Sequence, residues 1–295
     1  MKLVKVERNG ATAEGVVVGE QVRIIGRWRS GSPDKNSFAL SQKTLSELQE
    51  LLRGASESVS LSAVTLGVPI DPLAQIFCAG FNYRTHLTET NADEPKEPVI
   101  FKRTLDTLAP HGQPIIRPSV SHTLDYEGEI AVVIGREGRH IPVDTALSYV
   151  GGYSCFMDGS VREYQKHSVT AGKNFWHTGS MGPWIVTADD IGSADITLAT
   201  YVDGEQRQAS SASYMIFSIA RLVSYCSILT WLRPGDVIAT GTPGGVASRM
   251  TPPRWLKPGE TVEVDIGGVG RLRNVVADEG SQGQQAVKHR SLGAA

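Results

Sequence analysis

The spacing of apolar residues along this 295-residue chain predicts short strands far more often than helices. In the first 70 residues, apolar runs at 3–6, 15–18 and 22–25 are separated by the turn signals Asn9-Gly10 and Gly19-Glu20. A helix is predicted next, because Thr44 and Glu47 have capping-box spacing and leucines recur with a helical period up to Gly54. Residues 1–70 are therefore predicted to form a small β-rich domain.

After a proline-containing linker at 68–72, longer apolar runs predict a larger domain over residues 73–279. Its predicted strands are 76–79, 98–101, 129–134, 184–187, 196–202, 237–240, 261–266 and 272–277, and its predicted helices are 143–150, 160–166 and 214–231. Many strands with little βα alternation favour a mainly β, α+β fold with a mixed sheet over a Rossmann or TIM design. Residues 280–295 are polar and turn-rich, and a flexible tail is predicted there.

Composition and charge exclude several classes of protein. A net charge of −2 implies no strongly basic face for nucleic acid. The most apolar stretch, 215–232, is interrupted by Arg221, so no membrane span is predicted. The three cysteines are widely spaced and odd in number, which favours buried thiols over disulfides or a zinc site and is typical of the cytoplasm.

The first candidate chemistry is a pair of acids at the mouth of an apolar run. Glu127 and Glu129 flank Gly128 and lead directly into 130–134. Side chains two apart on a strand point the same way, so the two carboxylates would repel each other unless a cation compensates them. Two solvated glutamates at a strand start are the alternative. Gly128 and the apolar run weaken this alternative, because they indicate burial and a close approach of another backbone.

A third acid, Asp158, follows an apolar run and precedes a Gly-Ser turn. From its position alone it is either a helix cap or a third ligand. Three carboxylates without a Cys or His ligand would select a hard cation, Mg²⁺, Mn²⁺ or Ca²⁺, rather than zinc. Such an ion would keep coordination positions open for water or substrate.

Several segments, in this order, resemble the fumarylacetoacetate hydrolase family in its short bacterial form. They are Phe77-Cys78-Ala79-Gly80-Phe81-Asn82-Tyr83-Arg84-Thr85-His86, Asp125-Tyr126-Glu127-Gly128-Glu129, Asp158 with Ser160-Val161-Arg162 and Gln165, Gly172-Lys173-Asn174-Phe175, Gly182-Pro183-Trp184, Leu232-Arg233-Pro234-Gly235-Asp236 and Thr240-Gly241-Thr242-Pro243-Gly244-Gly245-Val246. The resemblance covers about two-thirds of the chain. It departs from the family pattern at Met157, Gly159 and Arg103, which bears on substrate identity.

The resemblance implies a mixed β-sandwich roll, a homodimer and a Mg²⁺ or Mn²⁺ site. The site residues that it implies are the metal ligands Glu127, Glu129 and Asp158; the catalytic residues His86, Glu89 and Lys173; and the substrate contacts Arg84, Arg162, Gln165 and Thr242. His86 and Glu89, spaced H-x-x-E on a mobile lid, would act as a base dyad. Without the resemblance, His86 and Lys173 would be read as ordinary surface residues.

The family's chemistry implies a small-molecule 2-oxo acid substrate and an enolate that the cation stabilises. The leading expectation is a hydrolase that cleaves the C–C bond of an acylpyruvate-like 2,4-diketo acid, because His86 could activate the attacking water. An oxaloacetate-type decarboxylase and a 2-hydroxy-dienedioate isomerase remain alternatives. A metal-binding protein without turnover is a further alternative. Loss of the dyad or of a metal carboxylate would indicate such a protein, and all of these residues are present.

Overall fold

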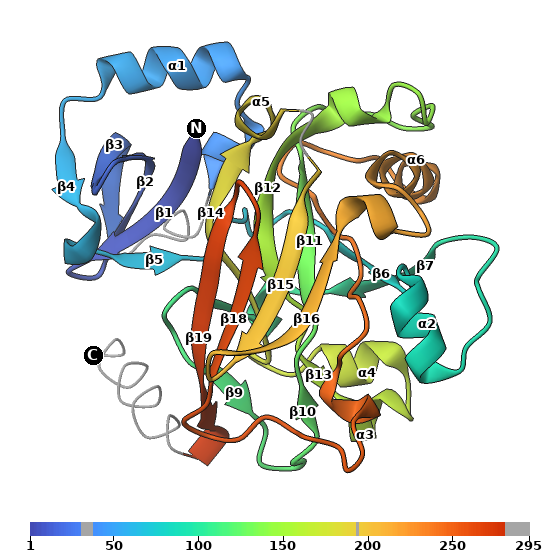
Figure 1. Cartoon of the computed structure of the whole chain (residues 1–295). Helices are drawn as coiled ribbons and strands as arrows, with labels where there is room; N and C mark the ends of the chain where they lie inside the picture. The colour runs from blue at the N-terminus through green and yellow to red at the C-terminus, as the bar shows by residue number, and fades with distance from the viewer. Residues whose placement is uncertain (31–37, 193–194, 281–295) are drawn as a thin grey trace.

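A computed structural model describes residues 1–30, 38–192 and 195–280 of the chain. Two packed sheets form its body (Figure 1). The larger sheet has the strand order β4-β3-β2-β1-β14-β12-β11-β17-β6-β7, with β5 added beside β1 and β8 beside β14. The chain is therefore mainly β, as predicted. Most of the predicted tail, from residue 281, lies outside the described residues.

The N-terminal strands form one end of the large sheet. They are β1 (Lys2–Arg8), β2 (Ala11–Val18), β3 (Gln21–Ser30), β4 (Ser58–Ser60) and β5 (Thr65–Gly67). The helix α1 (Leu45–Gly54) has the predicted capping box, in which Thr44 accepts from the Glu47 amide and Glu47 accepts from the Thr44 amide. Lys2 and Leu3 of β1 pair with β14, so this unit continues the same sheet.

The rest of the large sheet carries the segments of chemical interest. It comprises β6 (Ile76–Gly80), β7 (Val99–Arg103), β8 (Leu108–Pro110), β11 (Gly128–Ile134), β12 (Val150–Met157), β14 (Gly179–Thr187) and β17 (Val237–Ala239). The strand β11 lies between β12 and β17 and is antiparallel to both. All seven of its residues are buried, as the unbroken apolar run predicts.

The second sheet packs against β11, β12 and β14. Its strands, in spatial order, are β16 (Glu205–Ser211), β15 (Thr197–Val202), β18 (Thr261–Ile266), β19 (Gly270–Asp278) and β9 (Ile115–Arg117). Ile130 and Val132 of β11 join the core between the sheets, whereas Ala131 and Val133 join a core on the opposite face. Glu129 shares the parity of Ala131, so its side chain lies on that opposite face.

Helices are short and lie at the ends and edges of the sheets (Figure 1). They are α2 (Arg84–Thr90), α3 (Arg162–Gln165), α4 (Val169–Lys173), α5 (Ala188–Ile191) and α6 (Ile219–Leu229). Single 3₁₀ turns occur at Ala39–Gln42, Leu61–Ala63, Leu105–Thr107, Ala146–Tyr149, Ala212–Tyr214 and Ala247–Arg249 (η7), and β10 (Leu124–Asp125) pairs with β13 (Ser160–Val161). Among the described residues, every helix is too short or too polar to cross a membrane.

Two predicted helices are corrected by the structure. The predicted helix 143–150 is wrong: the segment forms only the 3₁₀ turn Ala146–Tyr149, and β12 begins at Val150. The predicted helix 214–231 is shorter, because Ser218 caps α6 by accepting from the Arg221 amide. The strands β12 and β16 were not predicted. The three cysteines are free and buried, which confirms their prediction as packed thiols.

Gly128 marks the contact between the two sheets. A Cβ atom at this position would lie 2.0 Å from Thr200 Oγ1 of β15 and 3.4 Å from a methyl group of Val264. A tight contact at Gly128 is therefore confirmed, but the prediction that another backbone makes it is wrong, because side chains of Thr200 and Val264 fill the space. Glycine here lets β15 and β18 pack beneath the strand that presents the two glutamates.

Candidate metal centre and its cavity

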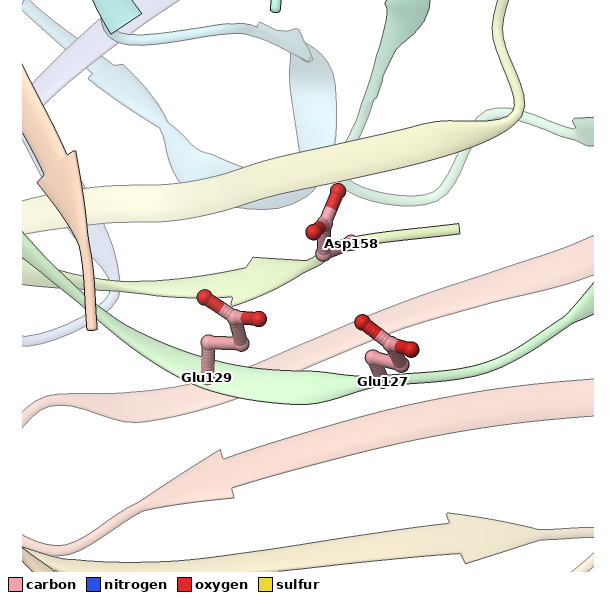
Figure 2. A group of neighbouring side chains, drawn as sticks. All are labelled: Glu127, Glu129 and Asp158. Carbon is pink, nitrogen blue, oxygen red and sulfur yellow. The ribbon is translucent and has the colours of Figure 1, made fainter. Parts of the chain in front are cut away.

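Two neighbouring strands bring the three acids together. Glu127 and Glu129 flank the start of β11, and Asp158 follows the last residue of β12 (Figure 2). Gly128 pairs with Met157, and the Asp158 amide donates to the Glu127 carbonyl at 2.8 Å. One carboxylate oxygen from each acid lies within 4.8 Å of the others, and all three side chains are buried. The register of β11 and β12 thus places the Asp158 carboxylate beside the two glutamates, which spacing along the sequence could not predict.

Protein cations contact two of these acids. Lys173 Nζ, itself buried, lies 2.5 Å from Glu127 Oε2 and 2.6 Å from Asp158 Oδ2. Arg162 Nη2 lies 2.5 Å from the other oxygen of Glu127. Arg103 Nη1 donates to Asp158 Oδ1 at 2.5 Å, and both side chains are fully buried. Glu129 has a different partner, the Gly241 amide, which donates to its Oε2 at 2.9 Å.

The unequal distribution of cations splits the pKa values of the two glutamates. Burial alone would raise the pKa of Glu127, but the charges of Lys173, Arg162 and His86 lower it to about 2. Burial and the Asp158 charge raise the pKa of Glu129 well above its ordinary value. The pKa of Lys173 is raised: burial opposes its charge, but Asp158 and Glu127 more than compensate. Glu129 is therefore the acid that most needs a further positive charge.

The donor set fits a hard divalent cation. Three buried carboxylates offer oxygen ligands within a few ångströms, with no thiolate or imidazole among them. Such an ion would compensate Glu129, which lacks a cationic side-chain partner among the described residues. Glu127 and Asp158 would hold the ion with oxygens that protein cations also contact, so Lys173 and Arg162 would orient these ligands, as outer partners do in metal sites.

His86 and Glu89 form a dyad beside the carboxylates. His86 Nδ1 lies 2.7 Å from Glu89 Oε1, one helical turn along α2, and the histidine is 7 % exposed. The second oxygen of Glu89 accepts from the Gly245 amide at 2.8 Å, and Thr85 Oγ1 accepts from the Gly244 amide at 3.0 Å. The helix α2 is thereby fastened to the glycine turn that follows Thr242. His86 is a buried residue of the cavity, and its reading as a surface histidine is wrong.

Arg162 links the metal acids to a second turn. Its Nε donates to Asp125 Oδ2 at 2.8 Å, and Asp125 accepts from the Ala247 and Ser248 amides at 2.9 and 3.0 Å. Arg162 Nη1 also donates to Gln165 Oε1 at 3.0 Å, which leaves the Gln165 amide N–H groups for another acceptor. Burial of Arg162 opposes its charge, but Glu127 and Asp125 raise its pKa, so it stays cationic.

A cavity of about 450 Å³ opens over the three carboxylates. Its lining includes most of the predicted site residues: Glu127, Glu129, Asp158, His86, Lys173, Arg162, Gln165 and Thr242. Thr242 donates its hydroxyl proton to the Gly128 carbonyl and accepts from Gln208, so this hydroxyl is already engaged. Arg84 does not line the cavity. Its guanidinium is exposed and pairs with Glu94 at 3.0 Å.

Sequence reasoning missed three residues that organise the site. Arg103 was expected to bear on substrate identity and to leave the metal site untouched, which is wrong, because it contacts the metal acid Asp158. A basic residue at the end of an apolar strand was a usable signal of such a buried partner. Asp125 belongs to the conspicuous Asp-Tyr-Glu-Gly-Glu segment and could have been selected with it. Gln208 accepts from the Gly128 amide and donates to Thr242 and Pro243, but it sits in a polar strand that gave no signal.

The chain matches known proteins over this same region. A family model described as fumarylacetoacetate (FAA) hydrolase C-terminal matches residues 75–277. A relative named oxaloacetate tautomerase YisK, from Bacillus subtilis, is 40 % identical over 224 residues, which are 74 % of each chain. Residues 75–277, which the family model matches, contain the three acids, the dyad and the glycine turn.

Solved structures extend the similarity to nearly the whole chain. A fumarylacetoacetate hydrolase from Exiguobacterium antarcticum is 32 % identical with a TM-score of 0.74, over 95 % of this chain and 100 % of that one. A maleylpyruvate hydrolase from Sphingobium sp. SYK-6, solved with manganese(II) and pyruvate, is 25 % identical with a TM-score of 0.78, over 94 % and 99 %. The sheets, the buried acids and these matches together assign the chain to the fumarylacetoacetate hydrolase family.

Proposed function

We propose that the chain is a metal-dependent hydrolase that cleaves the C–C bond of an acylpyruvate-like 2,4-diketo acid. The observation that carries this proposal is that His86, paired with Glu89 behind it, lines the same cavity as the three carboxylates. When bound there, Mg²⁺ or Mn²⁺ would supply positive charge to the oxygens of a 2-oxo acid and stabilise its enolate. The manganese and pyruvate in the Sphingobium structure support this choice of ion and product fragment.

The dyad has the geometry to activate water. A carboxylate only accepts hydrogen bonds, so His86 Nδ1 must donate to Glu89, and Nε2 is left as the basic nitrogen. Nε2 would take a proton from water as it attacks the distal carbonyl, and the electrons of the broken C–C bond would pass into the pyruvate enolate. Glu89 would then stabilise the imidazolium, as a carboxylate does beside a histidine base.

Three further side chains have proposed roles. Lys173 holds Glu127 and Asp158 in place and presents a buried positive charge to developing negative charge on the substrate. Arg162 and Gln165 lie on one face of α3 and line the cavity, where the Gln165 amide would donate to a substrate oxygen. Arg84 is not part of this proposal, because Glu94 engages it outside the cavity.

A second candidate is keto–enol tautomerisation of oxaloacetate, with decarboxylation or dienedioate isomerisation on the same enolate. The name of the 40 %-identical Bacillus relative favours the tautomerase. These reactions need proton transfer but no attacking water, so the dyad would serve as a proton carrier. The two candidates share the metal and differ in whether His86 must activate water. The proposed homodimer and the cytoplasmic location remain predictions.

A substrate panel separates these candidates. The purified protein with Mn²⁺ would be given acylpyruvates, oxaloacetate and a 2-hydroxy-dienedioate, and pyruvate, CO₂ and the enol absorbance would be followed. Pyruvate and a carboxylic acid from acylpyruvates support the hydrolase. Loss of the enol band of oxaloacetate without CO₂ release, and no acylpyruvate cleavage, supports the tautomerase. No turnover of any of them would contradict both.

Variants test the assigned roles. Glu127→Gln should abolish every activity and weaken the rise in melting temperature that Mn²⁺ produces, whereas exposed Glu137→Gln should change neither. His86→Ala should suppress hydrolysis more than oxaloacetate turnover, with exposed His122→Ala as its control. An equal loss of both activities in His86→Ala would contradict the role of His86 as the base that activates water.

A further inference from the structure

The inner end of the cavity is close to charge balance. Four buried carboxylates, Asp125, Glu127, Glu129 and Asp158, face three cations, Arg103, Arg162 and Lys173. Their formal charges sum to −1, so a bound divalent cation would bring the sum to +1. The single carboxylate of a chelating 2-oxo acid then neutralises this end.

The outer end of the cavity carries two further cations without acids to match them. Lys166, just after α3, and Arg249, at the end of η7, both line the cavity and are exposed. Within the described part of the chain, neither makes an ion pair, and the acids that line the cavity are the three metal carboxylates alone. The outer end therefore has a charge of +2 once the inner end is neutral. The acids on and just after α2 do not supply the balance, because none of them lines the cavity. Glu89 engages His86 and the Gly245 amide, Glu94 engages Arg84, and Glu97 engages Arg221.

The position of Arg249 is tied to the metal carboxylates. Asp125 accepts from the Ala247 and Ser248 amides at the start of η7, and Arg162 bridges Asp125 to Glu127. The Arg249 amide in turn donates to the Val246 carbonyl at 3.1 Å. Lys166 follows directly on the helix that carries Arg162 and Gln165. The backbone segments that carry both outer cations are thus linked to the metal end through the same bridging arginine.

We propose that Arg249 and Lys166 are specificity-determining residues that bind a second, distal carboxylate, so that the site prefers dicarboxylic 2-oxo acids over those with a neutral tail. This inference rests on the proposed function, because it takes the inner end as the binding place of the 2-oxo acid. The physical reason is that a distal carboxylate lowers the charge of the outer end from +2 to +1. It does so through charge-assisted hydrogen bonds to two cations that make no ion pair among the described residues.

Binding of matched probes to the Mn²⁺-loaded protein tests the proposal without turnover. N-oxalylglycine and N-ethyloxamate share the oxalyl group that chelates the metal, and only the first carries a distal carboxylate. Oxalate reports the inner end alone. Calorimetry on the wild type should show N-oxalylglycine bound about tenfold or more tightly than N-ethyloxamate. Arg249→Gln and Lys166→Gln should each reduce this ratio, and the double variant should bring it close to one, with oxalate affinity unchanged.

The control is Arg139→Gln, which removes an exposed cation outside the cavity and should leave the ratio unchanged. Oxalate binding with a ratio near one in the wild type, or a ratio that survives in the double variant, would overturn the inference and leave the proposed function standing. Absence of any Mn²⁺-dependent oxalate binding would overturn the proposed function and the inference together. Melting temperatures of all variants confirm that the exposed substitutions leave the fold intact.

Discussion

At the scale of single residues, Arg103 shows how a buried cation can set a metal ligand. Its guanidinium donates to Asp158 Oδ1, the Gly159 carbonyl and Thr107 Oγ1. A Cβ at Gly179 would lie 2.7 Å from Arg103 Nη2, so glycine is needed to leave room for the guanidinium. The planar fork of arginine satisfies these acceptors together, which a lysine ammonium could not.

Arg103→Met should destabilise the protein by about 3–5 kcal/mol, because it leaves a buried Asp158 with one cation fewer. Saturating Mn²⁺ should recover part of this loss, since the ion compensates the same carboxylate. Urea unfolding with and without Mn²⁺ measures both effects, with Arg139→Met as the surface control. A loss that Mn²⁺ does not reduce would show that Arg103 acts through packing rather than through Asp158.

Gly128→Ala should destabilise the protein by about 1–3 kcal/mol, because its Cβ would overlap Thr200 Oγ1. Thr200→Ala alone should be close to neutral, since this hydroxyl is buried and has no hydrogen-bond partner among the residues that the structure describes. The double variant should then recover most of the stability. A double-mutant cycle by urea unfolding checks this, and additive losses would mean that Thr200 is not the obstacle.

At the scale of elements, the connection between α2 and the glycine turn can be tested directly. Glu89→Ala removes the acceptor of the Gly245 amide, so amide hydrogen exchange in the 244–246 turn should accelerate by about tenfold. Glu94→Ala, which changes an exposed acid beyond the end of the same helix, should leave this exchange unchanged. If amide exchange in this turn is as slow in Glu89→Ala as in the wild type, then Thr85 or the turn itself provides the restraint.

Element prediction from sequence worked where the pattern was local. The strand 261–266 has the same limits in the structure, and the Thr44 cap begins α1 as predicted. The strand β12 was missed because its glycines look like a loop. In the structure these glycines permit close contact, since a Cβ at Gly151 would lie 2.7 Å from the Gly135 Cα and one at Gly152 would lie 2.4 Å from the Val186 carbonyl.

The missed strand β16 illustrates a second limit of sequence patterns. It is almost wholly polar, and its inward residue Gln208 is buried by hydrogen bonds to Gly128, Thr242 and Pro243 rather than by apolar packing. Likewise, Asp158 joins the glutamates only through the pairing of β11 with β12. The residue types of the site were therefore predictable from the sequence. Which residues come together depends on the pairing of distant segments, and for Asp158 only the family resemblance predicted it.

At the scale of the whole molecule, His111 helps join the two sheets near the turn after β8. Arg273 of β19 donates its amide to His111 Nδ1 at 3.1 Å, and the Gly112 amide donates to the Arg273 carbonyl at 2.8 Å. The accepting nitrogen must be unprotonated. Burial, reinforced by the Arg273 charge, lowers the pKa of His111 below its ordinary 6.5.

A histidine with a lowered pKa makes stability fall as the pH falls. The unfolded chain binds a proton near pH 6.5 and the folded chain only at lower pH, so between these values protons favour unfolding. His111→Asn keeps an acceptor but cannot titrate, so its melting temperature should decline less than that of the wild type between pH 7.5 and 5.5. His122→Asn, exposed, is the control. Parallel declines in His111→Asn and wild type would contradict the assignment.

The sharing of Glu89 between His86 and Gly245 bears on what sets the orientation of the base. His86 and Glu89 lie on the same helix, whereas Gly245 belongs to a segment 156 residues further along the chain than Glu89, so the carboxylate that orients the base is held in part from outside α2. A substitution in the 244–246 turn is therefore expected to change how the base is aimed without altering either member of the dyad.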